Sequence, residues 1–213
     1  MTHAATGNRR PRNKRGEGER LREEILAATD RLLVETGSED AVSIRAVADA
    51  IGVTPPAIYR HFADKTSLLF EVCAASFARM DRFITEAALH TDDPLEVLLR
   101  RAQAYVHFAL DNPEHYRIMV MGNSGATPVE YADEMLVGLG TFQHFVDCVQ
   151  RCVDAGAFRP ELTDAYDLTL ALWAAVHGVA SICIAKPDMP GPPPADRLAL
   201  MIDVTLRGVL PPS

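Results

Sequence analysis

The apolar residues of this chain recur at spacings of three and four along almost its whole length, which is the period of an amphipathic α-helix. Glycine, proline or asparagine interrupts this pattern at intervals, and no segment shows the sustained alternation of a half-buried strand. The pattern therefore predicts an all-α chain with about nine helices. Their expected ranges are 21–36, 43–51, 54–62, 64–87, 94–112, 113–121, 129–155, 162–186 and 195–209.

The stretch from Ser43 to Phe62 carries the most specific local pattern. Ser43 can cap a short helix, and a glycine at position 52 then allows a tight turn. Thr54 can cap a second short helix that has two prolines in its first turn, where a missing N–H group costs least. Together with the preceding helix, this pattern predicts a helix-turn-helix head with an exposed polar face suited to the major groove.

At these residues the chain resembles the TetR family of transcriptional regulators. The resemblance rests on the helix 21–36, VSIRAVADAIGV (42–53), TPPAIYRHF (54–62) and ADK (63–65), and less specifically on NPEHYRIMV (112–120) and the Trp173…His177-Gly178 spacing. Residues 1–20 are polar and have no apolar periodicity, so a disordered basic arm is expected there. The resemblance implies a DNA-binding head over 21–65 and a ligand-binding and dimerisation domain over 66–213. It further implies a repressor that binds a pseudo-palindromic operator as a homodimer and is released by a small, largely apolar molecule.

Two groups of head residues are candidates for DNA contact. Ser43, Tyr59, His61 and Lys65 can donate hydrogen bonds to phosphate oxygens, and the resemblance implies this role for them. Base readout is expected from Arg45, Thr54, Pro55, Pro56, Ala57 and Arg60. Arg45 could bond guanine with two N–H groups, worth about 1–3 kcal/mol of discrimination. The alternatives are solvated or phosphate-bound arginines at 45 and 60, and a half-buried core aromatic at Tyr59.

The net charge of −8 argues at first against a nucleic-acid partner, but the charge is unevenly distributed. Residues 1–65 hold 11 Lys+Arg and 10 Asp+Glu, a net of +1, whereas the rest hold 10 and 19, a net of −9. The arm is expected to enter a minor groove or follow phosphates, with a merely solubilising tail as the alternative. The cations counted with this arm are Arg9, Arg10, Arg12, Lys14, Arg15, Arg20 and Arg22.

The last two helices, 162–186 and 195–209, are the expected dimer element. The first carries small residues at helical spacing, and the second is amphipathic, so four helices could meet across a two-fold axis; the alternative is that both are core within one subunit. The residues behind this expectation are Ala174, Ala175, Gly178, Ser181, Leu198, Met201, Ile202 and Val209. The candidate ligand-lining residues, for each of which ordinary core is the favoured alternative, are Tyr105, Phe108, Tyr116, Met119, Phe142, Phe145, Trp173 and His177.

Other function classes have weaker support in the sequence. His144, Cys148 and Cys152 share a helix face, but a straight helix spreads them over about 12 Å, so buried thiols are expected rather than a metal site. No catalytic order of residues or phosphate loop indicates an enzyme, and no cofactor is implied. A helical small-molecule or metal sensor without tight DNA binding is the alternative function.

The uncharged run from Leu168 to Ala185 is at the lower limit for a membrane span, but its polar and small residues favour a fully buried helix. The N-terminal residues lack the apolar run of a secretory signal. The four cysteines are too few and scattered for a disulfide framework and indicate reduced thiols. A cytoplasmic location is therefore expected.

Overall fold

The structure is a computed structural model that describes residues 17–121 and 140–211. Within these residues it contains nine α-helices and one π-helical turn, and no strand, which confirms the predicted all-α fold. The chain divides after Val72 into two compact units, which are described separately below. The predicted arm over residues 1–16 and the predicted helical residues 129–139 lie outside the described residues.

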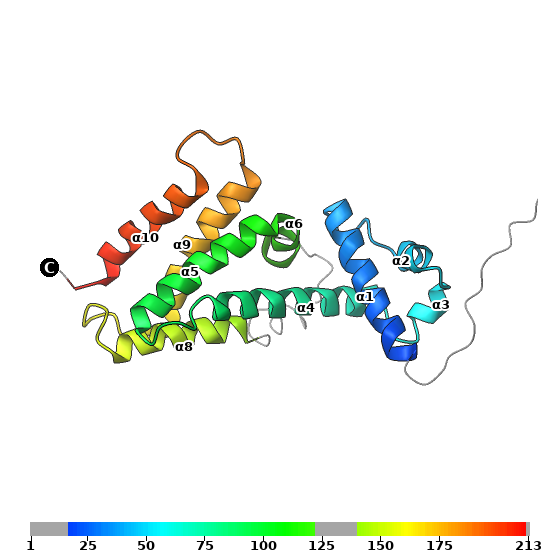
Figure 1. The fold of residues 1–213 in the computed structure, drawn as a ribbon, viewed down its shortest axis with the longest axis horizontal. Helices are drawn as coiled ribbons and strands as arrows, with labels where there is room; N and C mark the ends of the chain where they lie inside the picture. The colour runs from blue at the N-terminus through cyan, green and yellow to red at the C-terminus, as the bar shows by residue number, and fades with distance from the viewer. Residues whose placement is uncertain (1–16, 122–139, 212–213) are drawn as a thin grey trace, which may run out of the picture. The chain divides into compact units, whose positions relative to one another are not determined.

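The first unit contains α1 (Glu17–Thr36), α2 (Ile44–Ile51), α3 (Pro55–Ile58) and the first turns of α4 (Lys65–Glu86) (Figure 1). The predicted boundaries between α1 and α2 and between α2 and α3 are confirmed. The backbone reverses at two glycines with positive φ, Gly37 at 61° and Gly52 at 68°, a conformation that residues with a Cβ rarely adopt. Ser43 caps α2 by accepting a hydrogen bond from the N–H of Ala46 at 3.1 Å.

Two predictions about these elements are wrong. α1 begins at Glu17, so the last four residues of the predicted disordered arm are helical. α3 ends at Ile58, so Arg60 lies in the following turn rather than on the helix. Hydrogen bonds from the N–H groups of Tyr59 and Phe62 to the carbonyls of Pro55 and Ile58 keep this turn compact.

The second unit contains the rest of α4 with α5 (Pro94–Asp111), α6 (Pro113–Tyr116) and a π-helical turn (Arg117–Met121). Its remaining helices are α8 (Thr141–Asp154), α9 (Ala165–Ala185) and α10 (Pro194–Val209). α9 packs against α5, α8 and α10 (Figure 1). The core joins buried residues of α4, α5, α6, α9 and α10, with the side chains of Val106, Ala109, Tyr116 and Ala180 fully buried.

The prediction that the uncharged helix is fully buried is wrong for the single chain. α9 is long and apolar enough to cross a membrane by length and composition, and only 28 % of its most apolar window is buried inside the chain. One such helix is weak evidence for a membrane, because soluble proteins contain apolar helices of the same kind. Tyr166, Leu170 and Ile182 of α9 are exposed instead.

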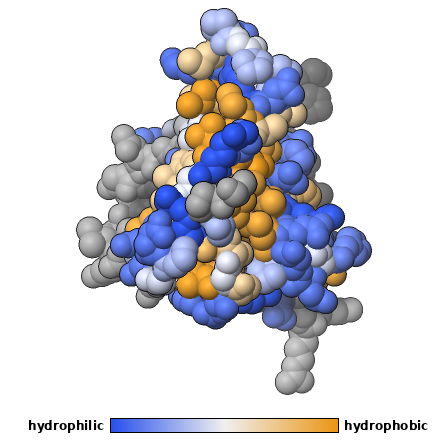
Figure 2. Space-filling model, turned by 90° about the vertical axis from the view of Figure 1, so that its left-hand side faces the viewer, coloured by the Kyte–Doolittle hydropathy of each residue, from blue (hydrophilic) through white to orange (hydrophobic). Residues whose placement is uncertain are grey.

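The apolar positions predicted for the dimer face of α10 point into the second unit. Leu198 is buried, Met201 and Ile202 pack against the same core, and Val209 packs against a neighbouring buried cluster. The apolar residues that α10 exposes are Leu200 and Val204, at 61 % and 62 %. Hydrophobic residues form a band between hydrophilic ones on one side of the second unit (Figure 2).

Candidate nucleic-acid interface and effector site

The predicted DNA-contacting residues are arranged around α2, α3 and the turn that follows. Ile58 and Phe62 pack inward, which turns the intervening Tyr59 and Arg60 toward solvent. Tyr59 is 53 % exposed, so the alternative of a core aromatic does not describe this ring. The predicted residues that are exposed are Ser43, Arg45, Thr54, Pro56, Tyr59 and Arg60, while Pro55, His61 and Lys65 are partly buried.

Ala57 departs from this pattern. Its residue surface is 7 % exposed, because it sits in the one full turn of α3 on the side that packs against the head core. Ala57 is thus largely buried in the head, and its expected base contact stays a prediction. Arg45, in contrast, has a side chain that is 87 % exposed, and its guanidinium lies 4.0 Å from the carboxylate of Asp49 one turn later. An ion pair this exposed to solvent is weak, so the Arg45 guanidinium can exchange Asp49 for a stronger partner.

Lys65 has a structural partner that the sequence did not indicate. Its ammonium donates a hydrogen bond of 2.7 Å to the carbonyl oxygen of Glu39, between α1 and α2. Burial raises the pKa of the Glu39 carboxyl, and the Lys65 charge partly offsets that rise. The bond fixes the Lys65 ammonium at the start of α4 and leaves two of its three donors for other acceptors.

The two cations expected to extend the basic arm, Arg20 and Arg22, both lie in α1. Arg20 pairs with Glu24 at 3.0 Å on an exposed helix face. Arg22 pairs with Glu71 of α4, and its guanidinium carbon lies 5.3 Å from the centre of the Phe62 ring. The Arg22 side chain therefore has its partners within the head.

In the second unit, four of the eight candidate ligand-lining residues are connected by hydrogen bonds. The indole N–H of Trp173 lies 3.2 Å from the hydroxyl of Tyr105, which lies 3.0 Å from that of Tyr116. The Tyr116 hydroxyl is 2.7 Å from Nδ1 of His177, whose Nε2 is 3.2 Å from the hydroxyl of Ser181. Burial raises the tyrosine pKa values and lowers that of His177, so the chain of bonds is uncharged at neutral pH.

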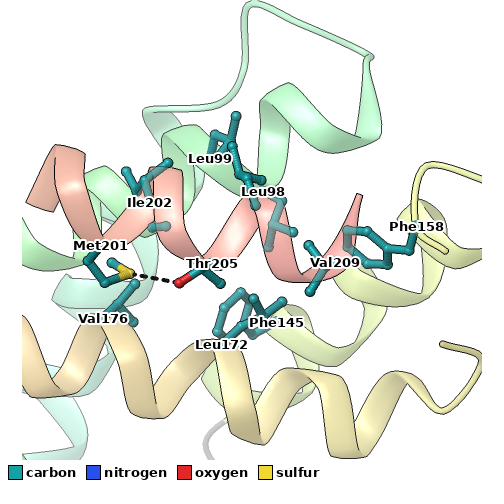
Figure 3. Close-up of a pocket in the computed structure, with 12 residues that line it drawn as sticks. Leu98, Leu99, Phe145, Phe158, Leu172, Val176, Met201, Ile202, Thr205 and Val209 are labelled. Carbon is teal, nitrogen blue, oxygen red and sulfur yellow. Dashed lines mark hydrogen bonds between the residues drawn. The ribbon is translucent and has the colours of Figure 1, made fainter. Parts of the chain in front are cut away.

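The other candidates of this set are divided between two places. Phe108 and Met119 are buried in the same core as the tyrosines, and Phe142 contacts the Trp173 ring edge to face at 6.2 Å. Phe145 lines a separate apolar cavity of about 40 Å³ between α5, α8, α9 and α10 (Figure 3). The one hydroxyl that lines it, on Thr205, is bonded to the sulfur of Met201 at 3.4 Å. None of the other seven predicted ligand residues lines this cavity.

The residues weighed as metal ligands lie in different surroundings. His144 faces Asp81, with Nδ1 3.1 Å from each carboxylate oxygen, whereas Cys148 and Cys152 are fully buried. Burial raises the pKa of both thiols, that of Cys152 to about 12, which keeps them protonated. Over residues 17–121 and 140–211, no group of three or more His, Cys, Asp or Glu side chains could hold a metal ion.

The first unit is a three-helix head with an exposed helix-turn-helix surface, and the second is a helical bundle with an apolar core; together they define a DNA-binding regulator with a separate body. The profile described as "Bacterial regulatory proteins, tetR family" matches residues 25–72, and "Tetracyclin repressor-like, C-terminal domain" matches residues 98–205. The chain belongs to the TetR family of transcriptional regulators, which are DNA-binding proteins and not enzymes.

Individual relatives agree with this assignment. The chain is 27 % identical over 131 residues to the HTH-type transcriptional activator FasR of Mycolicibacterium smegmatis, covering 62 % of this chain and 56 % of the relative's length. A Rhodococcus sp. RHA1 protein of unknown function has a similar structure, with TM-score 0.75, 26 % identity and coverage of 90 % and 96 % of the two chains. A TetR family transcription regulator of Marinobacter aquaeolei VT8 shares the fold, with TM-score 0.70, 18 % identity and coverage of 93 % and 100 %.

Proposed function

We propose that this protein is a dimeric transcriptional regulator that binds a pseudo-palindromic operator and leaves it when a small, largely apolar molecule binds the body. The observation that carries the proposal is the exposed surface formed by Ser43, Arg45, Thr54, Tyr59 and Arg60 on and after two short helices. These three polar side chains and two arginines can bond phosphates and major-groove base edges.

Each DNA-contacting group is assigned a separate role. Tyr59, His61 and Lys65 position the head on phosphates, and the N-terminus of α2 beside Ser43 adds its free N–H groups. Arg45, Thr54, Pro56 and Arg60 face the bases, with Pro55 at the edge of this group. The cations Arg9, Arg10, Arg12, Lys14 and Arg15 precede α1 in the sequence, and we assign them to the flanking phosphates or minor groove.

Dimerisation is assigned to the exposed faces of α9 and α10. A single short recognition helix binds weakly, whereas two heads can contact major grooves about 34 Å apart. The exposed apolar residues of the two helices support this interface, as does the exposed Ala174 beside the partly exposed Gly178. A Cβ placed on Gly178 would meet nothing within 4 Å in the single chain, so this part of α9 has room for a second helix.

The effector is assigned to the aromatic cluster around Trp173. The apolar cavity of about 40 Å³ is far smaller than the roughly 300–1,000 Å³ of ordinary ligand pockets, so it does not hold the effector by itself. An apolar molecule with one polar group could instead separate the aromatic rings and take over a hydrogen bond between Tyr105 and Tyr116. Burial of its apolar part would provide the binding free energy.

We assign repression as the direction of control, because a dimer that covers two adjacent major grooves excludes RNA polymerase from an overlapping site. Activation is the second candidate, favoured by the name of the relative FasR. In vitro transcription from a promoter carrying the selected operator separates them. A repressor lowers transcript yield in proportion to occupancy, and an activator raises it. The acting compartment is the cytoplasm, where the chromosome of a bacterium lies.

The effector assignment can be tested because Trp173 is the only tryptophan of the chain. A library of apolar carboxylates, alcohols and amides is screened for release of fluorescent operator DNA, and each hit is then titrated while tryptophan emission is recorded. The proposal predicts that emission changes with the same midpoint as operator release. An effector that releases DNA with unchanged emission, or with emission that changes at a different midpoint, contradicts the assigned site.

A further inference from the structure

The Arg22 side chain contacts two other parts of the head, the Phe62 ring after α3 and Glu71 of α4. It projects from the second turn of α1, its guanidinium lies over the Phe62 ring at 5.3 Å, and it forms an ion pair with Glu71 of α4. Phe62 is 3 % exposed and directly follows the turn that presents Tyr59 and Arg60. The Arg22 guanidinium thus contacts both the residue that follows the Tyr59–His61 turn and the next helix, α4.

We propose that Arg22 and Glu71 are positioning residues for DNA binding: together they hold the Tyr59–His61 turn in register with α4, and Arg22 does not contact DNA. This inference rests on the proposed DNA-binding function of the head. A planar guanidinium can stack on an aromatic ring with its face and bond a carboxylate with its edge at the same time, which an ammonium cannot do. Because α3 has only one turn of its own, the contacts at its C-terminal side hold the turn in place.

The geometry around α1 supports the same role. The start of α1 lies against the same turn, because a Cβ on Gly18 would be 4.0 Å from Cε1 of His61. The Arg22 and Glu71 side chains are 42 % and 34 % exposed, so their pair is partly shielded from solvent. A partly shielded pair is stronger than a fully exposed one, but too weak to decide whether the head folds.

The experiment measures operator affinity and its salt dependence for Arg22→Gln, Glu71→Gln and the exchanged pair Arg22→Glu with Glu71→Arg. Each single variant is expected to weaken binding about fivefold, the upper range for one such ion pair. The exchanged pair is expected to restore at least half of this loss on a logarithmic scale. The slope of log affinity against log salt is expected to stay as in the wild type, because no phosphate contact is removed.

The Glu71→Gln variant separates positioning from direct contact most sharply. Removing a negative charge from the head favours DNA by simple electrostatics, so weaker binding in this variant requires a positioning role. Tighter or unchanged binding by Glu71→Gln overturns the proposal, as does a salt slope that falls by about 1 in Arg22→Gln. Arg31→Gln, at an exposed position further along the same helix, is the matched control and should change affinity less than twofold.

Two further measurements keep the outcome interpretable. Far-ultraviolet circular dichroism and thermal unfolding establish that each variant is folded at the temperature of the binding assay, and the exchanged pair tests the geometry even where a single variant is less stable. If the wild-type protein binds no selected duplex, the proposed function fails. If the wild type binds and the variants behave as the control does, only the positioning role fails.

Discussion

The hydroxyl of Tyr116 lies 2.7 Å from Nδ1 of His177, which connects the end of α6 to the middle of α9. When His177 is neutral, each of the four hydrogen bonds in this chain can have one donor and one acceptor. Trp173 donates to Tyr105, Tyr105 to Tyr116, Tyr116 to Nδ1, and Nε2–H to Ser181. A protonated imidazole has no acceptor on Nδ1, so protonation would break this arrangement as well as bury a charge.

The His177 arrangement predicts a pH dependence of stability. Burial lowers the pKa of His177 below its ordinary value of 6.5, so the unfolded chain binds a proton at a pH where the folded chain does not. Stability is unaffected by this group well above pH 6.5 and falls as the pH drops through 6.5 toward the lower folded pKa. Urea unfolding at pH 7.5 and 5.5 should show a larger loss for the wild type than for His177→Asn. An equal loss in both proteins would contradict this account of His177.

Gly178 provides a test of the dimer face. Gly178→Arg should keep the fold, because the added side chain meets open space and glycine is a poor helix former, but it should prevent close approach of a second α9. Sedimentation velocity should show a monomer, with operator affinity reduced at least a hundredfold. Gln103→Arg, which adds the same charge on the exposed side of α5, is the control and should stay dimeric. A dimeric Gly178→Arg protein would place the interface elsewhere.

Ser43 has two separable roles that respond differently to substitution. Ser43→Ala removes the cap of α2 and should lower the free energy of unfolding by about 1 kcal/mol. Ser43→Asp keeps a capping oxygen and a stable helix, but it places a negative charge on the proposed phosphate-facing surface. Chemical denaturation and DNA titration should therefore separate the two variants. Tight operator binding by Ser43→Asp would show that the start of α2 does not face DNA.

Arg45 and Tyr59 should differ in sequence dependence. Tyr59→Phe removes a phosphate donor and should weaken binding to every duplex by a similar factor, about fivefold for one hydrogen bond. Arg45→Lys keeps the charge and loses the two-pronged donor, so it should relax base preference at one position with little change in the salt slope. Binding to a panel of single-base operator variants checks both. A uniform loss in Arg45→Lys would assign Arg45 to the phosphates.

The local signals of the sequence predicted the head well, because they act within a few residues. The cap at Ser43, the turn at Gly52 and the prolines at the start of α3 each determine the backbone next to them. The sequence does not predict the start of α1, because residues 17–20 are polar and have no apolar periodicity. The sequence does not predict the short extent of α3, because the end of this helix depends on the burial of Phe62 and its contact with Arg22 of α1.

Contacts between distant positions could not be predicted in the same way. The sequence groups Arg22 with the basic arm and does not reveal its partner, because Glu71 lies 49 residues away. Helical periodicity likewise identifies an apolar face of α10 but does not say whether that face meets its own core or a second chain. Leu198 faces the core, whereas Leu200 and Val204 are exposed. The aromatic candidates can be listed from the sequence, but the hydrogen bonds that join four of them depend on the tertiary packing of three helices, and their role in ligand binding stays a prediction.

Selection of bound duplexes from a random pool by the wild-type protein tests the central claim most directly, followed by sequencing and footprinting of the enriched DNA. The account predicts an inverted repeat whose half-sites are centred about one helical turn apart, bound by two chains, with affinity that falls steeply as salt rises. Enrichment of no sequence, or of a single half-site bound by one chain with affinity that does not depend on salt, would contradict it.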